Sequence, residues 1–189
     1  EWWRSVLREN EDFKIVDVAL HCDWSKLNIS ISEALNFELP ELLCEYYEIV
    51  YDTFEAVEPT ELQLKLLNGE VYKCGKTTKR FLGLKQLLVY YSYSNYLLNS
   101  YMNDTGLGFK QKTDSYSLTI PLKDVKDFQI KYRNMAYTII KQLKEYICHI
   151  PELASEYDLF LECDCGCSDG NCDFTEKRVS KFKPKIIKK

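Results

Sequence analysis

An apolar repeat near the end of the chain limits the possible folds more than any other feature. Its members recur between Val125 and Ile150 in seven steps, or about 3.6 residues a step. Pro151 follows directly, and a residue before proline is disfavoured in the helical conformation. The sequence therefore predicts a long helix that ends there. The residues predicted on its buried side are Val125, Phe128, Tyr132, Met135, Ile139, Leu143, Tyr146 and Ile150.

A second helix is predicted over residues 81–103, FLGLKQLLVYYSYSNYLLNSYMN. It carries two apolar stripes, one through Leu84 and Leu88 and the other through Leu87 and Tyr90. A helix that is apolar around so much of its circumference is buried on more than one side. We expect one stripe to pack within the chain and the other to contact a neighbouring subunit. The tyrosines proposed for that contact are Tyr90, Tyr93, Tyr96 and Tyr101.

The first part of the chain predicts shorter elements. Residues 13–20 are β-branched and favour a strand, and a polar, irregular stretch follows them. A helix is predicted from Pro40, which suits a first helical turn, to about Val57. A small β-hairpin is predicted over residues 62–74, because Asn68-Gly69 favours a type I′ turn between two apolar runs.

Residues 104–123 interrupt the helical pattern with Gly106, Gly108 and Pro121. Such a long connection inside a compact domain usually has a function. It is also too apolar for an idle linker, so we expect an extended arm that packs elsewhere. The apolar residues proposed for its contacts are Phe109, Tyr116, Leu118 and Ile120.

These elements predict a mainly α (α+β) fold, a helical bundle with long core helices, a small β-hairpin and an extended inter-helix arm. In the expected division, residues 1–150 form the helical domain and residues 151–189 form a C-terminal extension. No run reaches eighteen apolar residues, so no membrane span and no membrane partner are expected.

The sequence offers no combination of residues typical of an enzyme, and we expect neither a catalytic site nor a cofactor. Its two histidines, His21 and His149, lie outside any metal or triad spacing. Gly106 and Gly108 lack the third glycine of a dinucleotide-binding turn. Paired acids such as Glu45 and Glu48 lie on a predicted helix face, where solvated charge is the usual state.

The C-terminal extension has a cysteine cluster and a basic tail. The cluster, CDCGCSDGNC, holds Cys163, Cys165, Cys167 and Cys172. Its spacing differs from two C-x-x-C knuckles, so free thiols are favoured, with a zinc site or a disulfide as alternatives. Residues 174–189 have seven bases and one acid, a charge of +6, which leaves −10 on residues 1–173 because the whole chain is −4. Such a tail binds nucleic acid, docks on an acidic neighbour or is solvated.

Between Leu66 and Ile147 the chain resembles the neck-ring, or head–tail connector, proteins of crAss-like and related phages of Bacteroidetes. The resemblance lies in the order of LLNGEVYKCGK, FLGLKQLLVYYSYSNYLLNS, DTGLGFKQKTDSYS and KDFQIKYRNMAYTIIKQLKEYI. The family has a glycine turn, an aromatic helix opened by Gly-Leu-Lys, an arm rich in Thr, Gly, Lys and Ser, and a last long helix. Here Gly83-Leu84-Lys85 opens the aromatic helix.

The resemblance implies a virion structural protein without enzyme activity, assembled in the bacterial cytoplasm and located in the virion neck. Its copies would form a closed ring, a dodecamer if it matches the portal. Its partners would be the portal protein, other neck or tail proteins, and double-stranded DNA that passes without sequence recognition. The alternative left open is a cytosolic, zinc-stabilised protein-binding module.

Overall fold

The computed structural model describes residues 7, 12–16, 24–74, 76–105, 108–111 and 121–150, with backbone alone for 102–105 and 108–111. This part of the chain is mainly helical, with two small antiparallel hairpins, which confirms the predicted fold class. The predictions for residues 112–120 and for the extension at 151–189 concern residues outside the described part of the chain.

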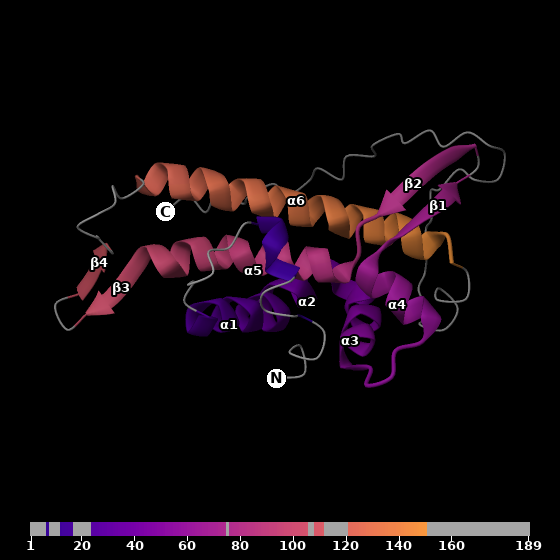
Figure 1. Cartoon of the computed structure of the whole chain (residues 1–189), viewed down its shortest axis with the longest axis horizontal. Coiled ribbons are helices and arrows are strands. Elements are labelled where there is room, and N and C mark those ends of the chain that lie inside the picture. The colour runs from indigo at the N-terminus through magenta and orange to yellow at the C-terminus, as the bar shows by residue number, and fades with distance from the viewer. Residues whose placement is uncertain are drawn as a thin grey trace, which may run out of the picture.

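Two long helices dominate the structure, α5 (Leu84–Tyr101) and α6 (Leu122–Cys148), and they confirm the two strongest helical predictions. They pack side by side along most of their length, and α1 (Trp24–Glu33) packs against α5 as well (Figure 1). Because α5 has helices on more than one side, both of its apolar stripes are covered over its first turns. The expectation that the chain leaves one whole stripe open is therefore wrong.

The N-terminal predictions are also wrong where the structure describes them. Residues Asp12–Val16 form a 3₁₀ turn, η2, instead of a strand, and α1 occupies part of the stretch predicted to be irregular. Phe13 and Val16, three residues apart, are both buried, as the tighter 3₁₀ turn allows. In α1 the hydroxyl of Ser30 donates to the carbonyl of Lys26. Ser32 likewise donates to the carbonyl of Asn28, so both serines satisfy their hydroxyl donors within the helix. The polar residues of α1 weaken its apolar signal in the sequence.

The helix predicted from Pro40 is made of several pieces. The chain passes through a π-helical turn, η3 (Ala34–Glu38), then α2 (Leu39–Leu43), a 3₁₀ turn η4 (Cys44–Tyr46) and α3 (Tyr47–Glu55). Pro40 lies in the first turn of α2, as expected. The break after α2 coincides with Cys44, whose φ of 50° is incompatible with a continuous helix.

A hairpin is present but begins later than predicted. Residues Glu61–Asn68 form α4, which starts with a reciprocal capping box between Thr60 and Gln63. Gly69, with a φ of +83°, ends α4 and is not part of a type I′ turn. The strands are β1 (Glu70–Cys74) and β2 (Thr77–Phe81), paired from Glu70 opposite Phe81 to Cys74 opposite Thr77.

The predicted arm begins as a second antiparallel hairpin, β3 (Met102–Thr105) and β4 (Gly108–Gln111). Figure 1 shows the two hairpins at opposite ends of the α5–α6 pair. One apolar core joins the described elements, from Leu7 in the N-terminal segment to Ile147 near the end of α6. The described residues therefore form one elongated body.

Candidate functional site

Two of the four tyrosines proposed as subunit contacts, Tyr90 and Tyr93, pack against Tyr132 of α6. Tyr90 is only 5% exposed, and its ring lies 6.1 Å from that of Tyr132 on α6. Tyr93 is half-buried and meets Tyr132 edge-on at 5.0 Å, while Tyr96 stacks on Tyr93 at 6.1 Å. Tyr101 is half-buried at the end of α5. Tyr90 is thus a core residue, whereas contacts of the other three with a second chain stay a prediction.

The arm residues are only partly placed by the structure. Phe109 lies in β4, opposite Asp104 of β3, and its side chain is not described. Tyr116, Leu118 and Ile120 lie outside the described residues.

The outer side of α6 has exposed apolar residues among lysines. Ile130 is 54% exposed and Tyr137 is 51% exposed, and their seven-residue spacing puts them on one side of the helix. The ammonium of Lys141 lies 5.2 Å from the centre of the Tyr137 ring. We call this surface the basic face; its exposed members are Lys123, Lys126, Ile130, Tyr137 and Lys141.

The exposed side of α3 has the opposite charge. Tyr51 is 37% exposed and its hydroxyl donates a 2.6 Å hydrogen bond to Oε1 of Glu55. This hydrogen bond is the main cause that raises the pKa of Tyr51 above its ordinary value, so the ring is held among carboxylates. We call this surface the acidic face; its exposed members are Glu48, Tyr51, Asp52 and Glu55.

Neither the acidic face nor the basic face was predicted from the sequence, although each corresponds to a recognisable pattern of charged residues in it. Residues 27–64 contain no lysine, arginine or histidine, and their acids are Glu33, Glu38, Glu41, Glu45, Glu48, Asp52, Glu55, Glu58 and Glu61. The lysines of α6 recur with Ile130 and Tyr137 at helical spacing, on the side away from the apolar repeat. The net charge of a long segment does not reveal this pattern, because the negative charges of the acidic face and the positive charges of the basic face offset each other in the sum.

A polar network fixes α6 to the N-terminal helices. Arg133 of α6 donates to Oε1 of Glu38 at 2.6 Å and to Oδ1 of Asn95 at 3.2 Å. The amide of Asn95 in turn donates to Oε2 of Glu38 at 3.1 Å. Arg133 also lies over the ring of Tyr91, 5.7 Å from its centre. Three segments distant in the sequence, η3, α5 and α6, are thereby held in one relative position.

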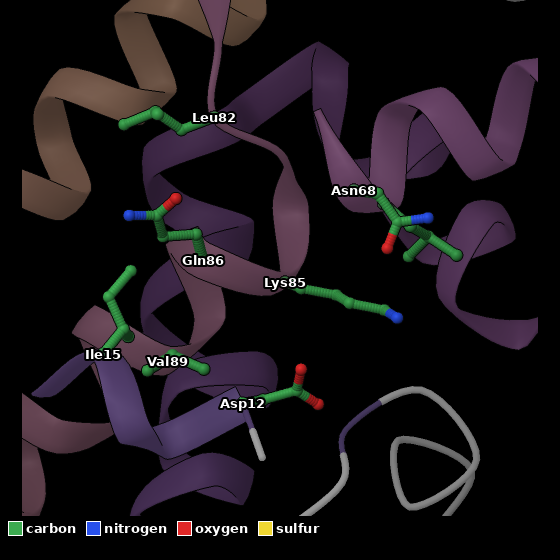
Figure 2. A pocket seen from close by; sticks show the side chains of 8 residues that line it. Asp12, Ile15, Asn68, Leu82, Lys85, Gln86 and Val89 are labelled. Atoms are coloured by element: carbon green, nitrogen blue, oxygen red, sulfur yellow. The ribbon is translucent and has the colours of Figure 1, made fainter. Parts of the chain in front are cut away.

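A pocket of about 300 Å³ opens beside the start of α5. Figure 2 shows Lys85 extending across it, with Asp12 on one side and Asn68 on the other. The remaining lining residues are apolar apart from Gln86. Among the described lining residues there is no histidine, cysteine or hydroxyl side chain. The polar groups there, Asp12, Asn68, Lys85 and Gln86, can form hydrogen bonds to a ligand.

The candidate metal ligands are placed only in part. Among the described residues, no three His, Cys, Asp or Glu side chains gather closely enough to hold a metal ion. The cysteine cluster and His21 lie outside that part of the chain. Neither Cys44 nor Cys74 is in a disulfide bond, and Cys148 is disulfide-bonded. His149 bonds through its ring to the carbonyl of Lys73, next to the ring of Tyr72, and so has a structural contact.

Comparisons with known proteins place the chain in a family. No curated protein matches it, and no solved structure matches it. No helix in the described part of the chain is long and apolar enough to cross a membrane. A family model does match residues 39–170, which include both faces and the hairpin between β1 and β2. The chain therefore belongs to the family described as a family of unknown function (DUF6712).

Proposed function

We propose that the protein is a structural subunit of a homo-oligomeric ring in the head–tail connector of a tailed phage. In this role it links the portal to the tail and surrounds the DNA channel. The observation that carries the proposal is the presence of two different exposed, apolar-containing faces on one rigid body. Figure 1 shows α6 along one long edge of the molecule and α3 at the opposite edge, with α5 between them.

A closed ring of identical subunits needs two such faces. Ring contacts are head-to-tail, so each copy presents one surface to the copy before it and a different surface to the copy after it. Aromatic side chains are enriched where proteins meet, and the centre of an interface is more apolar than the rest of the surface. The acidic face supplies Tyr51, and the basic face supplies Ile130 and Tyr137.

The charge distribution also suits a channel for passing DNA. Residues 1–173 have a net charge of −10, and a surface of the same sign as the phosphates allows a duplex to slide. The charge of +6 on residues 174–189 is available for a neighbouring subunit or for DNA. The resemblance between Leu66 and Ile147 narrows the kind of ring to the phage neck.

Light scattering coupled to gel filtration, with metal analysis of the same peak, tests the proposal on the full chain. A large oligomer without stoichiometric metal is expected. A monomer at all accessible concentrations that holds one zinc ion would contradict the proposal. That result would instead favour a zinc-stabilised protein-binding module.

A further inference from the structure

We infer that the acidic face of one copy docks on the basic face of the next. The partner of each face is thus a second copy of this chain. This inference rests on the proposed ring and names the surfaces that close it.

The acidic face is a short helical ridge with an aromatic centre. Its four side chains lie at positions 48, 51, 52 and 55, which share one side of α3. The opposite side of α3 is buried through Ile49, Val50, Thr53 and Phe54. Tyr51 is held at its hydroxyl by Glu55 and at its ring by Tyr47, whose centre lies 6.1 Å away. An aromatic ring fixed in this way loses little conformational freedom on binding.

The basic face has the same design with the opposite sign. Lys123, Lys126 and Lys141 surround Ile130 and Tyr137 on the side of α6 away from the core. Ala136 and Ile140, on the inner side, are buried. Of the acids of α6, Asp127 is exposed and lies at the edge of the face, four residues from Lys123 and three from Ile130, while Glu145 is paired with Lys79 of β2. The face therefore has an excess of positive charge, with three lysines to one exposed acid.

The signs of the charges determine which surfaces pair. Two acidic faces repel each other, and so do two basic faces, which disfavours a symmetric dimer through either one. An acidic face and a basic face attract, and their pairing is head-to-tail by construction. Such contacts close into a ring when the rotation between copies allows it.

The apolar members of the two faces suit the centre of this contact. Interfaces have an apolar, aromatic-rich centre and a polar rim. Pairing would bring Tyr51 of one copy towards Ile130 and Tyr137 of the next, with carboxylates opposite ammonium groups at the rim. The aromatic groups then supply affinity, while the charges supply orientation and rate of association.

Charge reversal on each face, alone and in combination, tests the inference on the full chain. One variant combines Glu48→Lys with Asp52→Lys, and the other combines Lys126→Glu with Lys141→Glu. All four side chains are exposed, so both variants are expected to fold, as checked by circular dichroism and melting temperature. Lys73→Glu with Lys76→Glu, on the β1–β2 hairpin, gives the same change in charge as the basic-face variant, but away from both faces, and serves as the control.

Each face variant alone is expected to weaken self-association by at least about tenfold, measured by sedimentation velocity. The control variant is expected to assemble like the wild type. An equimolar mixture of the two face variants is expected to assemble again, because each now has the charge that the other needs. This rescue would also show that both variants are folded.

Other results would overturn the inference in distinct ways. If the wild type assembles and the face variants assemble equally well, the ring stands but its contacts lie elsewhere. If only the acidic-face variant loses assembly, the basic partner is another segment, such as residues 174–189. If the wild type itself never assembles, the proposed function fails together with the inference.

Discussion

The backbone of Gly83 lies directly against the backbone of Gly69, where the chain enters β1 and leaves β2. A Cβ atom at Gly83 would lie 2.6 Å from the amide nitrogen of Gly69 and 2.6 Å from the carbonyl carbon of Asn68. This close crossing joins the end of α4, the base of the β1–β2 hairpin and the start of α5. The glycine turn and the Gly-Leu-Lys segment, which lie apart in the sequence, are therefore two halves of one structural unit.

Replacing Gly83 with alanine is expected to destabilise the protein by about 1–3 kcal/mol. The φ of +96° is unfavourable for any residue with a Cβ, and the nearest neighbours are backbone atoms that cannot rotate away. Chemical denaturation of the variant measures the loss. Lys76→Ala, at an exposed position in the same hairpin, is the control and is expected to change stability little. Equal stability of Gly83→Ala and the wild type would show that the crossing is not tightly packed.

The pair of Glu38 and Arg133 is expected to contribute about 1 kcal/mol of coupling free energy. The pair is half-exposed, which screens it, but Asn95 bridges the two side chains and orders them. A double-mutant cycle with Glu38→Gln and Arg133→Met measures the coupling from urea unfolding. Additive effects of the two substitutions would mean that the network orients α6 without stabilising it.

Stability is expected to fall at alkaline pH through Tyr146. Burial, followed by the hydrogen bond to Glu70, raises the pKa of Tyr146 above the ordinary value of 10.0. The folded state therefore holds the hydroxyl proton of Tyr146 more tightly than the unfolded state does. The contribution of Tyr146 to the free energy of unfolding is complete below about pH 10 and is lost as the pH rises above that value.

Tyr146→Phe is expected to cost about 1 kcal/mol at neutral pH, from the lost hydrogen bond, and to make the alkaline decline shallower. Urea unfolding at pH 8 and at pH 10.5 measures both effects. Tyr137→Phe, on the exposed side of α6, is the control. If the free energy of unfolding of Tyr146→Phe falls between pH 8 and pH 10.5 as much as that of the wild type, groups other than Tyr146 cause the loss of stability.

Tyr90 and Tyr137 are expected to respond in opposite ways to substitution by alanine. Tyr90 is buried against α6, so its truncation should lower stability by about 3 kcal/mol or more. Tyr137 is half-exposed, so its truncation should leave the melting temperature nearly unchanged and weaken self-association. Melting curves and sedimentation velocity on both variants separate the two effects. A stable Tyr137→Ala variant that assembles normally would remove this residue from the interface.

Sequence periodicity predicted the two long helices because each has an apolar repeat long enough to define its period. The α5 stripes run through Leu84 and Leu87, both fully buried, and the α6 repeat runs through Ile139 and Leu143, also fully buried. The first half of α6 departs from the pattern. Phe128 and Met135 are 47% and 36% exposed, so part of the predicted buried stripe faces outward.

Local signals misled where tertiary contacts decide the structure. Phe13 and Val16 favour a strand by composition, yet they pack as a 3₁₀ turn that contacts α5. Asn68-Gly69 favours a hairpin turn, yet Gly69 ends α4 because it must cross Gly83. A close approach between residues so far apart in the chain leaves no trace in the pattern around either of them.

The composition favours an assembly surface rich in tyrosine, and that surface stays a prediction. Of the α5 tyrosines named for it, Tyr90 and Tyr93 pack against Tyr132 within the chain. Tyr90 is buried because α6 packs against its side of α5. Sequence periodicity does not indicate which side of α5 the helix α6 will cover. The exposed tyrosines of the two faces, Tyr51 and Tyr137, become apparent only once the packing is known.

Electron microscopy of the purified, assembled full chain tests the central claim most directly. Class averages are expected to show closed rings of identical subunits around a central channel wide enough for duplex DNA. The long α5–α6 pairs should repeat around the ring, with α3 of each subunit against α6 of the next. Monomers, open filaments or symmetric dimers in place of closed rings would contradict the account.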